Sequence, residues 1–149
     1  MKNIQSALKS NEKATARIQH AIGDYRHAAN DHLHALGDIK HAKKDCAHAM
    51  EDFDHIITDF EHAFEDWKQG GSRAGHAAED FDHAGKDRNH AVADLEHAIK
   101  DINHALSDCN HAMRDLKHLD DDIAAVADLL DDPEISVADL KAYVLSEAT

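Results

Sequence analysis

Residues 20–40 read HAIGDYR-HAANDHL-HALGDIK, which is three successive copies of a seven-residue unit with the form His-Ala-x-x-Asp-x-x. The unit occurs fourteen times between His20 and Asp122, with one interruption after the seventh copy. Fourteen of the 15 histidines fall in this single phase, and only His32 does not. The spacing is therefore not a by-product of a histidine-rich composition.

Each unit supplies two candidate metal ligands, an imidazole at position 1 and a carboxylate at position 5. The histidines are His20, His27, His34, His41, His48, His55, His62, His76, His83, His90, His97, His104, His111 and His118. The aspartates are Asp24, Asp31, Asp38, Asp45, Asp52, Asp59, Asp66, Asp80, Asp87, Asp94, Asp101, Asp108, Asp115 and Asp122.

A seven-residue period without proline predicts an α-helix, because residues seven apart return to nearly the same side of a helix. A histidine and an aspartate four residues apart then lie one turn apart, where their side chains meet. One imidazole nitrogen and one carboxylate oxygen are half of a tetrahedral site for a borderline metal such as zinc. A second helix facing the first would complete that site.

The interruption, residues 69–75, contains three glycines, which supply the left-handed conformations of a helix end and a chain reversal. Seven units precede it and seven follow. Gly71 is the sequence midpoint between the innermost His-Asp pairs of the two arms, and it is also the midpoint between the outermost pairs. Folding at Gly71 would bring the arms level in seven layers, in which each histidine faces the opposing aspartate.

These patterns predict an all-α chain, a long antiparallel, coiled-coil-like hairpin with a short C-terminal helix, within one helical domain, residues 1–149. The expected elements are helix arm 1 at 4–68, a Gly-rich turn at 69–75, helix arm 2 at 76–131 and a short helix at 136–147. Pro133 ends the second arm. Ser136 and Asp139 resemble a capping box for the last helix.

Large apolar residues at positions 3 and 6 of the unit form an arc beside the ligand arc, as with Ile57, Phe60 and Trp67. In an antiparallel hairpin the apolar arcs of both arms emerge on the same side. That face needs covering, most simply by a second hairpin, which would make a homodimeric four-helix bundle.

Composition and charge restrict the class of protein. The chain is 42% hydrophobic with only 5% aromatic residues, so it leans on alanine and cannot fill a thick globular core. The formal net charge of -14 disfavours nucleic acid and anionic membranes as partners and suits cations. Cys46 and Cys109 form no CxxC pair and are expected as free thiols. With neither a secretory signal nor a membrane span apparent, we expect a cytoplasmic protein.

The functional prediction is a multi-site divalent metal-binding protein for storage, buffering or sequestration. Zn²⁺ suits imidazole and carboxylate best, and Co²⁺, Ni²⁺ or Cu²⁺ could also bind by ligand type. Seven layers imply seven metal ions per chain, whose fourteen positive charges equal the formal net charge in magnitude. Ca²⁺ is disfavoured because it prefers all-oxygen shells.

The alternative is a pH-responsive structural coiled coil, in which a His/Asp ladder binds protons and no metal. Metal is favoured because many partly buried ion pairs stabilise a seam poorly. An enzyme is not expected, because the same unit recurs with no distinguished member and a catalytic metal needs a unique pocket.

Overall fold

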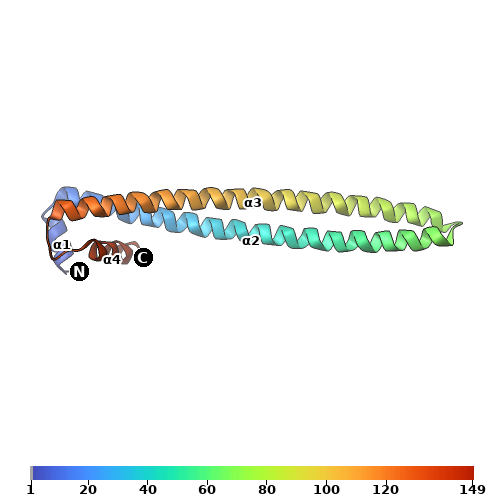
Figure 1. Cartoon of the computed structure of the whole chain (residues 1–149), viewed down its shortest axis with the longest axis horizontal. Helices are drawn as coiled ribbons and strands as arrows, with labels where there is room; N and C mark the ends of the chain where they lie inside the picture. The colour runs from blue at the N-terminus through green and yellow to red at the C-terminus, as the bar shows by residue number, and fades with distance from the viewer. Residues whose placement is uncertain (1) are drawn as a thin grey trace. The chain divides into compact units, whose positions relative to one another are not determined.

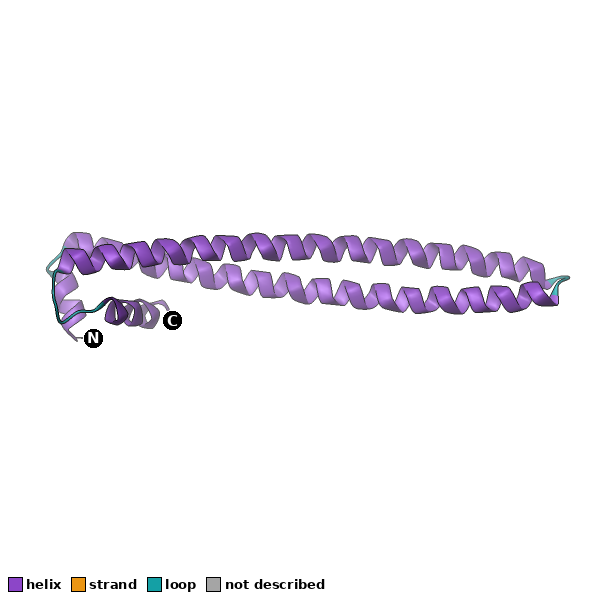
Figure 2. Cartoon of the chain, viewed as in Figure 1, coloured by secondary structure: helices purple, strands orange, loops and turns teal. Residues whose placement is uncertain are grey.

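A computed structural model of the chain describes residues 2–149 as helices joined by short connections (Figures 1 and 2). The helices are α1 (Lys2–Lys9), α2 (Glu12–Gln69), α3 (Arg73–Leu130) and α4 (Val137–Ala148). The long helices α2 and α3 pack against each other, and the described part of the chain has no strand, so the all-α prediction is confirmed. None of these helices combines the length and the apolar content that crossing a membrane requires.

The first predicted arm, residues 4–68, is divided into two helices, α1 and α2. The Asn11 side-chain oxygen accepts a hydrogen bond from the Ala14 N–H at 3.1 Å, so Asn11 caps the start of α2. The Ser10 hydroxyl donates to the Ala7 carbonyl at 2.7 Å and closes the end of α1. The expectation of one continuous helix from Ile4 is therefore wrong, because polar side chains at 10–11 compete for the backbone groups of a helix interior.

The reversal between α2 and α3 is shorter than the predicted 69–75. Gly70 and Gly71 adopt the left-handed conformation, with φ of 65° and 66°, which other residues rarely adopt. The Gly70 N–H lies 3.2 Å from both the Asp66 and the Trp67 carbonyls and satisfies the last turn of α2. Helix α3 begins at Arg73, so Gly75 lies inside its first turn.

The C-terminal elements agree with the predicted 76–131 and 136–147 to within a few residues. Helix α3 ends at Leu130, shortly before Pro133. Ser136 and Asp139 form the predicted capping box of α4. The Asp139 N–H donates to the Ser136 hydroxyl at 3.2 Å, and the Ser136 N–H donates to the Asp139 carboxylate at 3.0 Å.

The contacts of the chain group its residues into two compact units. Unit 1 comprises the residues up to Ala35 together with Leu106–Thr149, and unit 2 comprises Leu36–Ala105. The large buried side chains belong to unit 1, where α1, α4 and the adjoining ends of α2 and α3 meet. Its core includes Ile4, Leu8, Ile18, Leu119, Ile123, Val126, Leu140 and Val144.

Unit 2 has a seam of a different kind. Its buried apolar residues are all alanines at position 2 of the repeat, namely Ala42, Ala49, Ala63, Ala77, Ala84, Ala91, Ala98 and Ala105. The aspartates at position 5 are half-buried beside them, and the histidines at position 1 are exposed. Positions 2 and 5 recur with the three-and-four spacing of a coiled-coil heptad. Alanine therefore makes the contact between the helices, and histidine lies at its edge.

The packing of unit 1 makes a prediction about Leu140, which is fully buried at 0% exposure. Leu140→Ala should lower the free energy of unfolding by about 2–4 kcal/mol, because it removes apolar contacts and leaves a cavity. Leu145 lies on the same helix but is 45% exposed, so Leu145→Ala should lower it by only about 0.5 kcal/mol. Urea unfolding followed by circular dichroism compares the two variants. Equal losses would contradict the placement of α4 against the core.

Candidate metal centre

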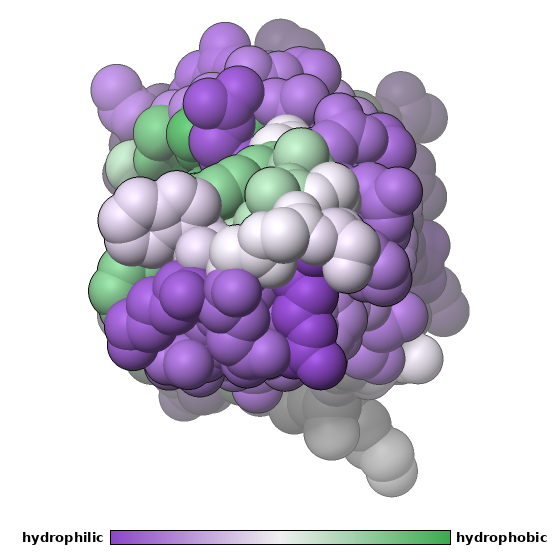
Figure 3. Space-filling model, turned by 90° about the vertical axis from the view of Figure 1, so that its right-hand side faces the viewer, coloured by the Kyte–Doolittle hydropathy of each residue, from purple (hydrophilic) through white to green (hydrophobic). Residues whose placement is uncertain are grey.

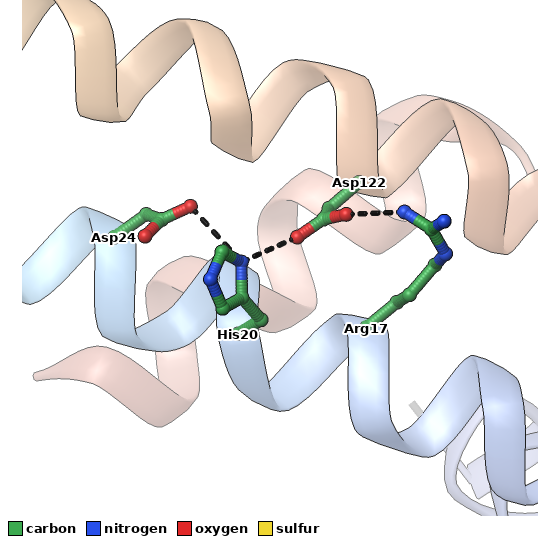
Figure 4. Close-up of polar contacts among 4 residues, drawn as sticks. All are labelled: Arg17, His20, Asp24 and Asp122. Carbon is green, nitrogen blue, oxygen red and sulfur yellow. Dashed lines mark hydrogen bonds and ion pairs between the residues drawn. The ribbon is translucent and has the colours of Figure 1, made fainter.

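Three of the predicted ligands meet at one point of unit 1 (Figure 4). His20 and Asp24 lie one turn apart on α2, and Asp122 reaches them from α3. His20 Nδ1 lies 2.7 Å from Asp122 Oδ2 and 3.3 Å from Asp24 Oδ2. One ligand atom from each residue falls within 4.8 Å of the others. His20 and Asp122 have Gly71 as their midpoint, so this contact matches the predicted pairing of the arms.

The two carboxylates of this centre are buried, with Asp24 at 7% and Asp122 at 8% exposure. Asp24 Oδ2 is fully covered and forms no hydrogen bond within the described part of the chain. Its polar contact is the ion-pair approach of His20 Nδ1 at 3.3 Å. A buried carboxylate oxygen that accepts no hydrogen bond is costly. A cation bound between Asp24, His20 and Asp122 would remove that cost, so the donor set fits a metal ion.

Arg17 was not predicted as part of the centre. Its Nη1 donates to Asp122 Oδ1 at 2.6 Å, so the Asp122 carboxylate lies between a guanidinium and an imidazole (Figure 4). Arg17 precedes the first repeat unit by one helical turn and carries no signal of the repeat. Its spacing of three residues from His20 places it on the same side of α2 and is the one feature that could have indicated it.

The ligands predicted for the second layer line a groove between α2 and α3 in unit 1. This groove has a volume of about 570 Å³. Its lining residues are His27, Asn30, Asp31, His34, His111, Arg114, Asp115 and His118. All four ligands predicted for the second layer are among them. His118, predicted as the fourth ligand of the first layer, is exposed in this groove and does not join the centre at His20.

The remaining predicted ligands share one environment. All fourteen histidines of the repeat are exposed, and all fourteen aspartates are half-buried or buried. Within residues 2–149, His20, Asp24 and Asp122 are the predicted ligands whose donor atoms lie close enough to hold one ion. The layers that would lie in unit 2 have their carboxylates at the alanine seam, with imidazoles at its edge.

The carboxylates of the centre raise the pKa of His20 above its ordinary value of 6.5. The hydrogen bond to Asp122 contributes most, and the negative charge of Asp24 adds to it. Partial burial and the positive charge of Arg17 act in the opposite direction. A metal ion at this centre must therefore displace a proton that the carboxylates hold in place.

Comparisons of the chain with protein-family models, with curated proteins and with solved structures found no match.

The geometry predicts the effect of Asp122→Asn on metal-free protein. The pKa of His20 should fall towards 6.5, because the variant loses the carboxylate that accepts its hydrogen bond. A raised folded-state pKa stabilises the fold fully below pH 6.5, and this contribution is lost as the pH rises through the folded-state pKa. The variant should lose that pH-dependent part of stability.

Nuclear magnetic resonance titration of the His20 ring measures this pKa directly. Asp121→Asn is the control, since Asp121 is the exposed neighbour of Asp122 and carries the same charge. An unchanged pKa of His20 in Asp122→Asn would contradict the pairing of α2 with α3 at this centre.

Proposed function

We propose that this protein binds several divalent metal ions along its repeat, zinc foremost, and serves to store or buffer them. The observation that carries the proposal is the contact between His20 on α2 and Asp122 on α3. These residues belong to the outermost units of the repeat. Their pairing is the register that would place each of the seven units of one arm beside a unit of the other. A register that holds at the outermost layer supports the same pairing for the layers inside it.

The chemistry of the donors favours zinc. Each proposed layer offers two neutral imidazoles and two carboxylates, a mixed nitrogen and oxygen set that suits tetrahedral Zn²⁺. Co²⁺, Ni²⁺ and Cu²⁺ accept the same donors, so selectivity among them would depend on geometry and on supply. Cys46 and Cys109, both free thiols, lie outside the ligand positions, so the layers lack the soft donors that favour Cu⁺.

The charges along the seam also support bound cations. Ion pairs from lysine, arginine or histidine reach the repeat aspartates of residues 2–149 only in the first and last layers. Arg17 lies 2.6 Å from Asp122, and Arg73 lies 3.5 Å from Asp66. The half-buried aspartates of the other layers have no such partner, and metal ions would neutralise them.

A second candidate function is a proton-responsive coiled coil that binds no metal. The observation in its favour is the 2.7 Å hydrogen bond between His20 and Asp122, with the raised pKa of His20. Protonated histidines beside aspartates would stabilise the helix pair in acid. That stabilisation would be lost as the pH rises and the histidines release their protons. Its dependence on pH is opposite to that of a metal-loaded protein, so the two candidates are separable.

Zinc stoichiometry tests the proposed function. Metal-free protein dialysed against zinc and then freed of excess should retain about seven ions per chain by elemental analysis, because the fourteen units would pair into seven layers. Removing one ligand should affect one layer, so His48→Gln should weaken the layer with Asp52, His90 and Asp94 and lower the count by one.

His32→Gln is the matched control, because His32 is exposed on the same helix but lies out of phase with the repeat. It should leave the zinc content unchanged. Absence of bound zinc in the wild type would exclude the storage function. Loss of every ion from His48→Gln would show that the metal ions bind as one cooperative cluster and not in independent layers.

The dependence of stability on zinc is a further prediction. Zinc binds the assembled seam better than the unfolded chain, so saturating zinc should raise the melting temperature strongly at pH 7.5. At pH 5 protons occupy the imidazoles, and the gain should largely disappear. Circular-dichroism melts with zinc and with a chelator at both pH values measure it. Equal melting temperatures at pH 7.5 would favour the proton-responsive coiled coil.

A further inference from the structure

A second apolar face follows the same helices in unit 2. Every large apolar side chain of unit 2 that is exposed lies at position 3 or 6 of the repeat and keeps 37–69% of its surface open. These residues are Leu36, Ile39, Met50, Phe53, Ile57, Phe60, Phe64, Trp67, Phe81, Val92, Leu95, Ile99 and Ile102. Seen from the turn between α2 and α3, apolar side chains gather on one side, and hydrophilic ones cover the others (Figure 3).

The extent of this face exceeds what a free surface normally carries. Half-exposed side chains of this size offer on the order of 80 Å² each, so together they present roughly 1,000 Å². The largest apolar patch of a typical monomer is about 300–600 Å². A stable protein interface covers about 800 Å² on each partner. The face is therefore large enough for a permanent contact.

The period of the face indicates what kind of partner fits it. Positions 3 and 6 recur with three-and-four spacing, so they form a second heptad beside the one at positions 2 and 5. The two heptads are offset by one residue, which is roughly 100° around the helix axis. A helix in a four-helix bundle contacts two neighbours on faces at about this angle. The matching partner is thus a pair of helices with the same period.

In unit 1, the short helix α4 packs against the apolar side chains that correspond to this face. In unit 1, Val144 and Leu145 of α4 line a small pocket together with Tyr25 and Leu116, both at position 6. In unit 2, the rings of Phe60 and Phe81, also at position 6, are 5.6 Å apart. The apolar side chains of α2 and α3 therefore meet across the seam at position 6.

We infer that a second copy of this chain packs on the unit 2 face, with α2 antiparallel to α2 of its partner. The face on α2 is self-complementary about a point between Glu51 and Asp52. Leu36 meets the partner's Trp67, Ile39 the partner's Phe64, Lys43 the partner's Phe60, Cys46 the partner's Ile57 and Met50 the partner's Phe53. Position 3 then always faces position 6, and the bulky rings near the turn face smaller side chains, as close packing requires.

The charges flanking the face favour the same direction. Lys40, Lys43 and Lys44 lie towards one end of the α2 segment of unit 2, and Glu61 and Glu65 lie towards the turn; all five are exposed. Lys68, also towards the turn, pairs with Glu65 at 2.9 Å and leaves Glu61 free of such a contact among the described residues. Antiparallel packing brings the lysines of one copy beside the glutamates of the other. A parallel arrangement of the α2 helices would place like charges together, and like charges repel.

The mass of the protein in solution tests the inference. The experiment uses chelator-treated protein, so it does not depend on metal binding. Light scattering should give 33 kDa for the wild type, twice the chain mass of 16.5 kDa. Ile57→Glu should give 16.5 kDa, because the substitution places a carboxylate in both halves of the interface. A monomeric wild type would overturn the inference.

Leu33→Glu is the matched control. Leu33 lies on α2, is 63% exposed against 57% for Ile57, and occupies position 7, outside the face. The variant should remain a dimer, with the helix content of Ile57→Glu. Dissociation of both variants to the same extent would overturn the assignment of this face.

A cross-linking experiment tests the antiparallel direction. In a Cys109→Ser background, Ile57→Cys places a second thiol opposite the partner's Cys46, so the oxidant diamide should produce a covalent dimer. The two thiols of one copy are eleven residues apart on one helix and too distant to bridge each other. Leu33→Cys in the same background should stay uncross-linked. Equal cross-linking of the two variants, or none in a dimeric Ile57→Cys protein, would overturn the antiparallel packing.

Discussion

Close approach of α2 and α3 through alanine is the constraint on which the other features of unit 2 depend. An alanine methyl group buries little apolar surface, so the seam gains less hydrophobic stabilisation than one made of leucine. Small residues let the helices approach closely and hold the neighbouring aspartates half-buried on both sides. Carboxylates gathered in this way repel one another and are partly withdrawn from water. Positive charge beside the seam would lower this cost, and each proposed function would supply it in a different form.

Within residues 2–149, arginine pairs with a repeat aspartate in two places, the outermost layer and the layer beside the turn. Arg17 pairs with Asp122 in unit 1, and Arg73 pairs with Asp66 in unit 2. Both arginines lie outside the fourteen units, so neither can be repeated along the chain. Within the units, histidine is the residue that recurs beside each aspartate. Its imidazole either carries a proton or binds a metal ion, and both proposed functions follow from that choice.

The sequence predicted the helices, the turn and the register, because a seven-residue period and a glycine pair constrain each of them directly. It did not predict the break before Glu12, since one capping side chain, Asn11, starts a new helix without disturbing the apolar period. It also placed histidine in the contact, whereas alanine occupies it. Neighbouring positions 1 and 2 differ by only about 100° around the axis, and periodicity alone does not decide which of them faces the partner helix.

The two proposals use opposite sides of the same seam. In an antiparallel pair, positions that precede the seam residues meet their equivalents on one side, and positions that follow meet on the other. His27, His34, His111 and His118 from both helices accordingly share one groove in unit 1, whereas Phe60 and Phe81 meet in unit 2. Covering the apolar side leaves the histidine side open to ions. If both proposals hold, metal exchange would need no separation of the two copies, which would suit a protein that stores metal and releases it.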